Sequence, residues 1–205
     1  MPQAGVIPGT AGYAAQAAAL VDQYEAIDPE HKHRAVLHLF PPAPSRVLDI
    51  GAGTGADAAW FAARGHSVVA VEPVAELREP GRALHRDADV EWVDDGLPDL
   101  ARLHHPPFDL VLLTAVWMHL DAAERHAAMP RVVAQLAPGG RLVFSLRHGP
   151  VPAGRRMFEV GADETLQLAH DAGLHVLLNV RTPSTQAHNQ AAGIEWTRLV
   201  FERPR

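Results

Sequence analysis

The feature of this sequence that most restricts its fold is the segment VLDIGAGTG at residues 47–55. Its apolar start suits a buried strand, and the glycines that follow at alternate positions permit a tight turn and a close approach of a ligand. A helix is then expected to open at Ala56. The first N–H groups of such a helix lack partners within it and can bind a carboxylate or phosphate. The segment therefore predicts a ligand site at the end of a buried strand.

Strand-like and helical stretches alternate over the central part of the chain. We predict strands at 46–50, 67–71, 90–93, 108–113 and 141–146, and helices at 56–63, 74–84 and 121–136. Alternation of this kind requires crossover connections and favours a mainly parallel sheet with helices on both faces. Pro130 lies inside the last of these helices, so we expect a kink or a restart there.

Both ends of the chain depart from this pattern. Residues 1–12 are small and rich in Pro and Gly, so we expect them to be flexible. Apolar spacing predicts a helix over 13–27, and Asp28-Pro29 begins another that reaches about Leu39, which together form an N-terminal helical cap over 13–40. A helix at 162–172 precedes strands at 174–181 and 194–202, and no crossover helix joins these strands, so they should be antiparallel neighbours. We expect one doubly wound α/β domain over residues 1–205.

Composition argues against several functional classes. The net charge of −6 gives no electrostatic footprint for nucleic acid or an anionic membrane. The absence of cysteine excludes disulfides and cysteine chemistry, and no apolar run is long enough to span a bilayer. The amino terminus has no secretory pattern, so we expect a cytoplasmic protein. The 13 histidines include close pairs, but none has helical metal-ligand spacing with a supporting carboxylate, so we expect no metal site.

Acidic residues near the glycine turn narrow the choice of ligand. Asp49 precedes the first glycine by two positions, and Glu72 follows the next predicted strand. A carboxylate there can accept hydrogen bonds from both hydroxyls of a ribose. The Gly-x-Gly-x-Gly spacing differs from the Gly-x-Gly-x-x-Gly of dinucleotide-binding folds, and the chain has no Tyr-x-x-x-Lys pair. An NAD(P)-dependent oxidoreductase is therefore the weaker alternative.

Four further segments accompany the glycine turn in a fixed order. They are VDDGLP at 93–98, FDLVLL at 108–113, AVWMHL at 115–120 and LAPGGRL at 136–142. With these segments, residues 46–147 resemble the class I S-adenosylmethionine (SAM) dependent methyltransferases, in particular small bacterial-type members that act on small molecules. The resemblance implies a Rossmann-like sheet of seven strands, mainly parallel with an antiparallel carboxyl-terminal strand, and SAM as the cofactor.

The resemblance also implies a role for each matching position. The glycine turn and Asp49 would hold the methionine part of SAM, Glu72 the ribose, and one of two aspartates the adenine. The implied cofactor residues are Asp49, Gly51, Gly53, Gly55, Glu72, Asp94, Asp95, Val116 and Trp117. Trp117 would also face the acceptor, although a place in the core is an equal alternative. Tyr13 and Tyr24 either pack their helix or close over the cofactor.

Methyl transfer from a sulfonium by in-line displacement depends mainly on positioning. His119 is the candidate general base, with a structural role at the start of a helix as the alternative. Arg147, Arg155 and Arg156 follow the fifth predicted strand and could clamp an anionic acceptor, or they could pair with nearby acids in a solvated loop. The polar loop 182–193 is a candidate wall of the acceptor pocket. We expect a small-molecule acceptor, with a non-catalytic SAM-binding protein as the main alternative.

Overall fold

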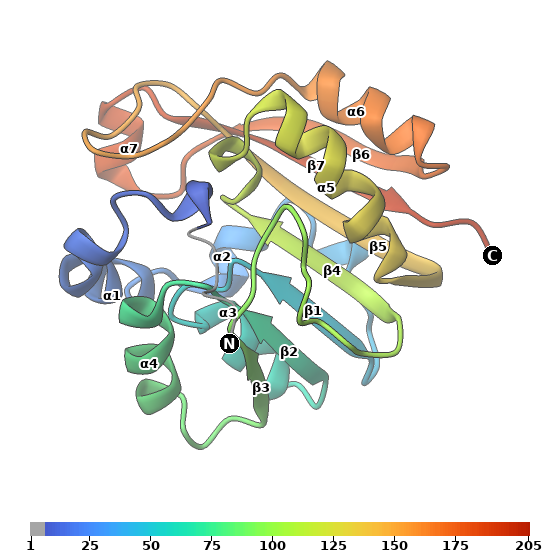
Figure 1. Cartoon of the computed structure of the whole chain (residues 1–205), viewed down its shortest axis with the longest axis horizontal. Helices are drawn as coiled ribbons and strands as arrows, with labels where there is room; N and C mark the ends of the chain where they lie inside the picture. The colour runs from blue at the N-terminus through green and yellow to red at the C-terminus, as the bar shows by residue number, and fades with distance from the viewer. Residues whose placement is uncertain (1–6) are drawn as a thin grey trace.

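A computed structural model describes residues 7–205 of the chain. Its seven strands form one sheet in the order β3-β2-β1-β4-β5-β7-β6 (Figure 1). The strands are β1 (Arg46–Ile50), β2 (Ser67–Val71), β3 (Val90–Val93), β4 (Phe108–Thr114), β5 (Leu136–His148), β6 (His175–Pro183) and β7 (Glu195–Glu202). The first five are parallel, and β7 lies antiparallel between β5 and β6. The predicted fold class and the antiparallel end of the sheet are confirmed.

Helices cover both faces of the sheet (Figure 1), and four short turns of 3-10 helix (η) lie in the described connections. The α-helices are α1 (Ala17–Glu25), α2 (Pro29–His33), α3 (Ala56–Ala62), α4 (Ala75–Leu84), α5 (Ala122–Ala134), α6 (Ala162–Asp171) and α7 (Ala187–Ala191). The 3-10 turns are η1 (Pro8–Thr10), η2 (Ala14–Gln16), η3 (Leu37–Leu39) and η4 (Trp117–His119). The helix predicted to run from Pro29 to Leu39 is wrong in its length, because α2 ends at His33 and η3 follows separately.

Alternation along β1 shows how the sheet divides the core. Leu48 and Ile50 point to the face covered by α5 and α6, whereas Val47 packs with Ala58 and Phe61 of α3 on the other face. Since side chains alternate along a strand, Asp49 points to the same face as Val47. An acidic side chain is thereby placed at the top of an otherwise apolar layer.

A local signal in the sequence marks the start of α5. The Asp121 carboxylate accepts a hydrogen bond from the Glu124 N–H at 2.9 Å, and the Glu124 carboxylate accepts one from the Asp121 N–H at 2.8 Å, which forms a capping box for α5. This helix continues through Pro130 without a restart. It ends at Ala134, and β5 begins at Leu136, earlier than its predicted start at Arg141, because Leu136 pairs with Phe108 of β4.

The amino-terminal segment lies at the carboxyl ends of the parallel strands, near the loop that precedes α7 (Figure 1). The expectation of flexibility for residues 1–12 falls partly outside the described residues. Of the remainder, Pro8–Thr10 form η1, and Gly9 lies against His119. Ala17 and Leu20 of α1 pack on Leu77 of α4, which fixes this segment over the end of the sheet.

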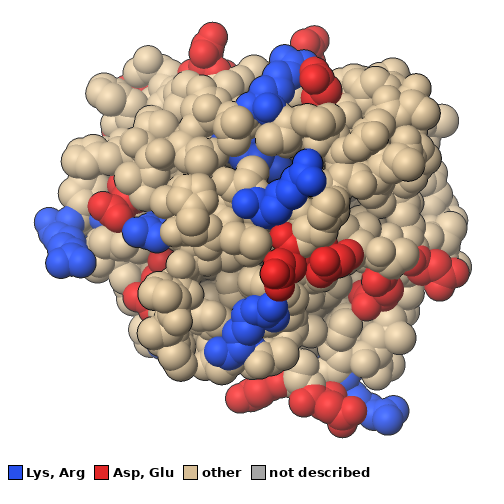
Figure 2. Space-filling model, turned by 180° about the vertical axis from the view of Figure 1, so that it is seen from behind, with Lys and Arg blue, Asp and Glu red and all other residues tan. Residues whose placement is uncertain are grey.

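On the face of the molecule shown in Figure 2, Lys and Arg side chains are interspersed with Asp and Glu rather than gathered by sign. Within residues 7–205, no helix is long and apolar enough to cross a membrane. The same residues contain no cluster of three or more His, Cys, Asp or Glu side chains arranged to hold a metal ion.

Candidate functional site

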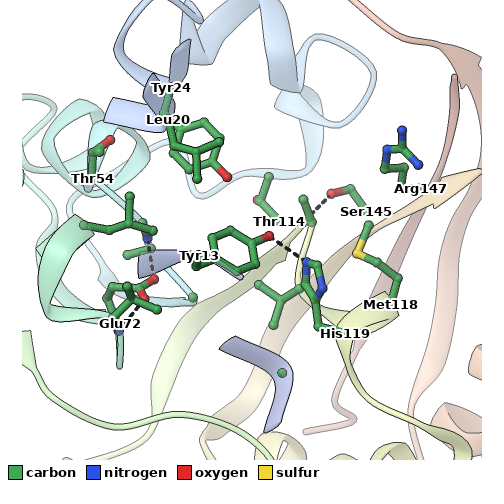
Figure 3. Close-up of a pocket in the computed structure, with 18 of the residues that line it drawn as sticks. Tyr13, Leu20, Tyr24, Thr54, Glu72, Thr114, Met118, His119, Ser145 and Arg147 are labelled. Atoms are coloured by element: carbon green, nitrogen blue, oxygen red, sulfur yellow. Dashed lines mark hydrogen bonds between the residues drawn. The ribbon is translucent and has the colours of Figure 1, made fainter. Parts of the chain in front are cut away.

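A pocket of about 390 Å³ opens where β1, β2 and β4 end (Figure 3). Its walls come from the amino-terminal segment, the glycine turn after β1, the turn after β4, the loop after β5 and the segment between β6 and β7. Ligands of open α/β sheets bind at the carboxyl ends of strands, and this pocket lies there. A volume of this size suits a small molecule.

The glycine turn forms one wall with its main chain. Gly51 and Gly55 have φ angles of +72° and +79°, which side chains other than glycine adopt only with strain. A Cβ at Gly51 would lie 2.5 Å from Val116 Cγ2, and one at Gly55 would lie 2.6 Å from the Trp92 ring. Gly55 is also the N-cap of α3, so the N–H groups of the first turn of that helix face this region.

Glu72 lies directly after β2 and faces the turn. Its carboxylate accepts hydrogen bonds from the N–H groups of Gly53 and Val74, both at 2.8 Å (Figure 3). Burial raises the pKa of Glu72 to about 7, although these two hydrogen bonds oppose the shift. Each carboxylate oxygen can still accept a further hydrogen bond, so this side chain can hold a pair of hydroxyls.

Asp49 is buried on β1 and also lines the pocket. Among the described residues, its carboxylate has no hydrogen-bond or ion-pair partner. Burial and the neighbouring Asp57 carboxylate raise the pKa of Asp49 to about 8. Asp57 is paired instead, with Lys32 Nζ at 2.7 Å and His33 Nε2 at 3.0 Å, which holds its pKa below the usual range. A cationic ligand group beside Asp49 would act as the positively charged partner of this carboxylate.

Tyr13 and His119 meet at the centre of the pocket. The Tyr13 hydroxyl lies 2.8 Å from His119 Nε2 (Figure 3). On the other side of the ring, His119 Nδ1 lies 2.8 Å from the Arg156 carbonyl oxygen. A carbonyl only accepts, so Nδ1 carries a proton and donates it. Burial lowers the pKa of His119 and keeps the ring neutral, so Nε2 accepts from the Tyr13 hydroxyl. The same burial raises the pKa of Tyr13 and keeps that hydroxyl protonated.

Arg155 holds Tyr13 from the other side. Its guanidinium carbon lies 3.7 Å from the centre of the Tyr13 ring, and its Nη2 donates to Gln16 Oε1 at 2.9 Å. Tyr24 approaches the glycine turn, since a Cβ at Gly53 would lie 3.4 Å from the Tyr24 ring. Both tyrosines line the pocket, Tyr13 from the residue before η2 and Tyr24 from α1. Both also pack against the apolar cluster between α1 and α4.

The structure does not support the pocket role predicted for Trp117. The turn after β4 directs its side chain away from the pocket, where it is fully buried and packs on Phe144 with ring centres 5.0 Å apart. Val116 lines the pocket as predicted, and Met118 and His119 from the same turn also contribute to its wall. Of the two alternatives for Trp117, the core is therefore the correct one.

Asp94, Asp95 and Arg156 are also outside the pocket lining. Asp94 is exposed and pairs with Arg78 and Arg102, both at 3.1 Å. The Asp95 carboxylate accepts from the N–H groups of Gly96 and Arg102 within its own loop. The adenine contact predicted for these aspartates has no support in this geometry, because local partners occupy both carboxylates.

Arg156 is occupied by acids at the start of α5. It pairs with Glu124 at 2.7 Å and Asp121 at 3.1 Å, so its predicted place in an anion clamp has no support in this geometry. Arg147 and Arg155 do line the pocket. Pairing with acids, the alternative given for these arginines, therefore applies to Arg156, and the acids are Asp121 and Glu124 at the start of α5.

Several pocket residues carry no recognisable signal in the sequence. They are Lys32, Asp57, Thr114, Ser145, Trp196 and Arg198. Ser145 and Arg198 lie opposite each other on β5 and β7, strands joined by more than forty residues of chain. Their proximity follows from the strand order, in which β7 lies beside β5. The sequence of β7 alone gives no sign that Arg198 faces a pocket.

Comparison with known proteins identifies the family. Residues 23–179 match a family model described as a methyltransferase domain. The chain belongs to the methyltransferase domain family. The resemblance noted in the sequence is thereby confirmed, and the glycine turn, Asp49 and Glu72 lie inside the matched region.

Curated relatives of this methyltransferase domain share its central part. An uncharacterised methyltransferase of Mycobacterium tuberculosis is 37% identical over 123 residues, which are 60% of this chain and 48% of the relative. A demethylmenaquinone methyltransferase of Clavibacter sepedonicus is 34% identical over 125 residues, or 58% of this chain and 49% of the relative. The chain thus matches these relatives over about half of their length.

Solved structures share the whole fold. A 1,6-didemethyltoxoflavin-N1-methyltransferase of Burkholderia thailandensis, with its substrate and S-adenosylhomocysteine (SAH) bound, superposes with a TM-score of 0.70. It is 23% identical, and the match covers 100% of this chain and 94% of that one. The N-methyltransferase NodS of Bradyrhizobium japonicum, with SAH bound, gives a TM-score of 0.68 at 19% identity and covers 93% and 100% of the two chains. These likenesses establish that the methyltransferase domain has the fold of SAM-dependent methyltransferases.

Proposed function

We propose that this protein transfers a methyl group from SAM to a small-molecule acceptor. The observation that carries the proposal is the pair of buried carboxylates, Asp49 and Glu72, on either side of a glycine turn. Neither has an ion-pair partner among the described residues, and the pKa of each is raised. A ligand with an ammonium group and two adjacent hydroxyls satisfies both carboxylates, and SAM has these groups.

The proposed cofactor contacts follow from these positions. Asp49 and the main chain of the glycine turn hold the methionine end, and Glu72 accepts from the ribose hydroxyls. Gly96 and Leu97 line the part of the pocket beyond β2 and take the place of Asp94 and Asp95 beside the adenine. When bound, SAM supplies an activated methyl group on a positively charged sulfur, and the protein has only to orient an acceptor in line with it.

Tyr13 and His119 provide a route for the acceptor proton. With SAM bound, the acceptor nitrogen or oxygen would bond to the methyl carbon as the methyl–sulfur bond breaks and its electron pair stays on sulfur. The Tyr13 oxygen would accept the proton that the acceptor loses. The Tyr13 proton moves at the same time to His119 Nε2, whose lone pair already faces it at 2.8 Å. The His119 N–H to the Arg156 carbonyl keeps the ring in this tautomer. His119 is thus proposed as the base, with Tyr13 between it and the acceptor.

The proposal is tested by binding and by turnover. Calorimetry should detect SAM and SAH binding to the purified protein, and formation of SAH in the presence of an acceptor library should reveal turnover. Absence of heat with both ligands would contradict the proposal. Binding of SAM without turnover on any acceptor would favour the non-catalytic alternative.

A further inference from the structure

The charged residues of the pocket are separated by sign except at Lys32, whose ammonium pairs with Asp57 at 2.7 Å. The acids that line it, Asp49, Asp57 and Glu72, lie on β1, α3 and after β2, at the end assigned to the cofactor. At the other end the charged residues are Arg147, Arg155 and Arg198. A cation is therefore favoured near the glycine turn, and an anion is favoured near β5 and β7.

Arg198 is the most informative of these arginines. Its side chain is only 6% exposed and lines the pocket, yet it makes no hydrogen bond or ion pair with the residues that the structure describes. The Trp196 ring lies beside it, with the ring centre 5.4 Å from the guanidinium carbon. Burial lowers the pKa of Arg198 to about 10, which still leaves it charged at neutral pH.

Arg125, a second buried arginine of this protein, has the partners expected of a structural residue. Arg125 of α5 is 4% exposed and makes a two-pronged ion pair with Glu164, at 2.8 and 2.9 Å, in addition to a hydrogen bond to the Leu120 carbonyl. Burial of a guanidinium is normally accompanied by such partners, because an unpaired buried charge is costly. Arg198 lacks them on the protein side.

Asp57, the acid that interacts electrostatically with Arg198, already pairs with other residues. Asp57 raises the pKa of Arg198, but its two oxygens face Lys32 and His33 at 2.7 and 3.0 Å. Arg198 therefore has most of its donors available to a molecule in the pocket.

The place of Arg198 separates it from the cofactor contacts. It lies opposite Ser145 on β5 and three strands away from β1, which is about 14 Å at normal strand spacing. Arg147 pairs with Trp196, so Arg147 and Arg198 are diagonal neighbours on one face, about 7–8 Å apart. Within residues 7–205, only Nη1 of the Arg147 guanidinium hydrogen-bonds to protein oxygen, at the carbonyls of Gly149 and Pro150.

We propose that Arg198, together with Arg147, forms a subsite for a carboxylate or phosphate group of the methyl acceptor. The inference rests on the proposed function, since it names the acceptor as a small anionic molecule. Two guanidinium groups on adjacent strands can each contribute paired N–H donors to such a group. Trp196 and the segment from Ser184 to Gln186 line the same part of the pocket and enclose the rest of the acceptor.

The test titrates small anions into protein saturated with SAH. Benzoate and phenyl phosphate are the anionic probes, and benzamide is the neutral probe of similar shape. The variant Arg198→Met removes the charge while keeping an apolar side chain of similar length. The control Arg181→Met removes an exposed arginine on the neighbouring β6 that pairs with Glu195 outside the pocket.

We expect wild type and Arg181→Met to bind at least one of the two anions, and Arg198→Met to bind it at least about tenfold more weakly. Benzamide affinity should be equal in all three proteins, and SAH affinity should change by less than about twofold. Arg198→Lys keeps the charge without the planar donor pair, so its anion affinity should be intermediate. If Arg198→Met does not fold, Arg198→Lys takes its place in the comparison with wild type.

Three results would overturn the inference. Equal anion affinity in wild type and Arg198→Met would show that Arg198 is not the ligand, and no anion binding by wild type would remove the subsite. A large loss of SAH affinity in Arg198→Met would assign Arg198 to the carboxylate of the cofactor instead. If wild type itself binds no SAH, the proposed function fails, and the same titration on cofactor-free protein still tests whether Arg198 binds anions.

Discussion

The two ends of the pocket are built in different ways. At the cofactor end the main chain forms the surface, through the left-handed glycines of the turn after β1 and the N–H groups that hold Glu72. At the acceptor end the surface consists of side chains from distant segments, such as Tyr13, Arg155 and Arg198. The first end depends on local backbone geometry that few sequences satisfy, whereas the second can change one side chain at a time. We therefore expect changes at the two ends to alter different measured quantities.

The largest effect should follow from Glu72→Gln at the cofactor end. This change removes the charge proposed to accept hydrogen bonds from two ribose hydroxyls, and hydrogen bonds to a charged group contribute about 1.5–3 kcal/mol each. We expect SAH affinity measured by calorimetry to fall by about 100-fold. The matched control is Glu76→Gln, an exposed acid in the first turn of α4, which should leave affinity unchanged. Equal affinities in the two variants would remove Glu72 from the site.

Tyr13→Phe, at the acceptor end of the pocket, should lower turnover without changing cofactor affinity. The variant keeps the ring beneath Arg155 but loses the hydroxyl that faces His119. We expect kcat to fall by about 10–100-fold, since proton transfer through a placed group contributes at least this much, while SAH affinity stays within about twofold.

His119→Gln provides the second arm of this test. If the two residues move one proton together, the double variant should be no slower than the slower single variant. Multiplied losses in the double variant, or a loss of SAH affinity in Tyr13→Phe, would show that Tyr13 acts on its own or serves the cofactor.

The sequence was sufficient for the fold and for placing the glycine turn, Asp49 and Glu72 at the pocket, because their signals are local. The glycine turn, Asp49 and Glu72 lie at the ends of strands whose apolar runs and spacing are plain within about 25 residues. A turn that requires positive φ favours glycine at fixed positions, so it can be recognised from the local sequence. The order of strands then places both carboxylates at one edge of the sheet.

The acceptor end was predictable only in part, because it depends on long-range packing. Arg147, Arg155 and Arg156 are close in sequence, but Arg156 reaches the start of α5, and only the other two line the pocket. Trp117 and His119 are two residues apart in one short turn, yet one enters the core and the other the pocket. Arg198 becomes prominent only when the described residues near it are seen to leave it without a partner.

Asp49 should make cofactor binding depend on pH. With its pKa raised to about 8, the carboxyl is mostly protonated in the free protein at pH 6–7, and a bound ammonium group favours the ionised form. SAH affinity should therefore rise by up to about tenfold per pH unit between pH 6 and 8, with release of about one proton. Calorimetry in buffers of different ionisation enthalpy measures this proton directly. In Asp49→Asn the release should disappear and affinity should be lower at pH 8; unchanged release would assign the proton to another group.

The same carboxyl should affect the stability of the cofactor-free protein. A carboxyl whose folded-state pKa is raised stabilises the fold below its unfolded pKa, and this contribution is lost as pH rises through the folded value. For Asp49 and Glu72 this window runs from about pH 4 to about 8. The midpoint of thermal unfolding should fall across it in wild type and fall less in Asp49→Asn. A steeper fall in the variant would contradict the raised pKa.

The smallest effect should come from Asp94→Asn, which asks whether the cofactor end includes the loop after β3. Asp94 is exposed and pairs with Arg78 and Arg102 outside the pocket, and exposed ion pairs contribute little free energy. We expect SAH affinity to change by less than about twofold and the unfolding midpoint to change only slightly. A tenfold loss of SAH affinity with unchanged stability would mean that the Asp94 side chain turns toward the adenine on binding. In that case only the part of the cofactor end between the glycine turn and Glu72 would be formed by the main chain. The loop after β3 would bind through its side chains, as the acceptor end does.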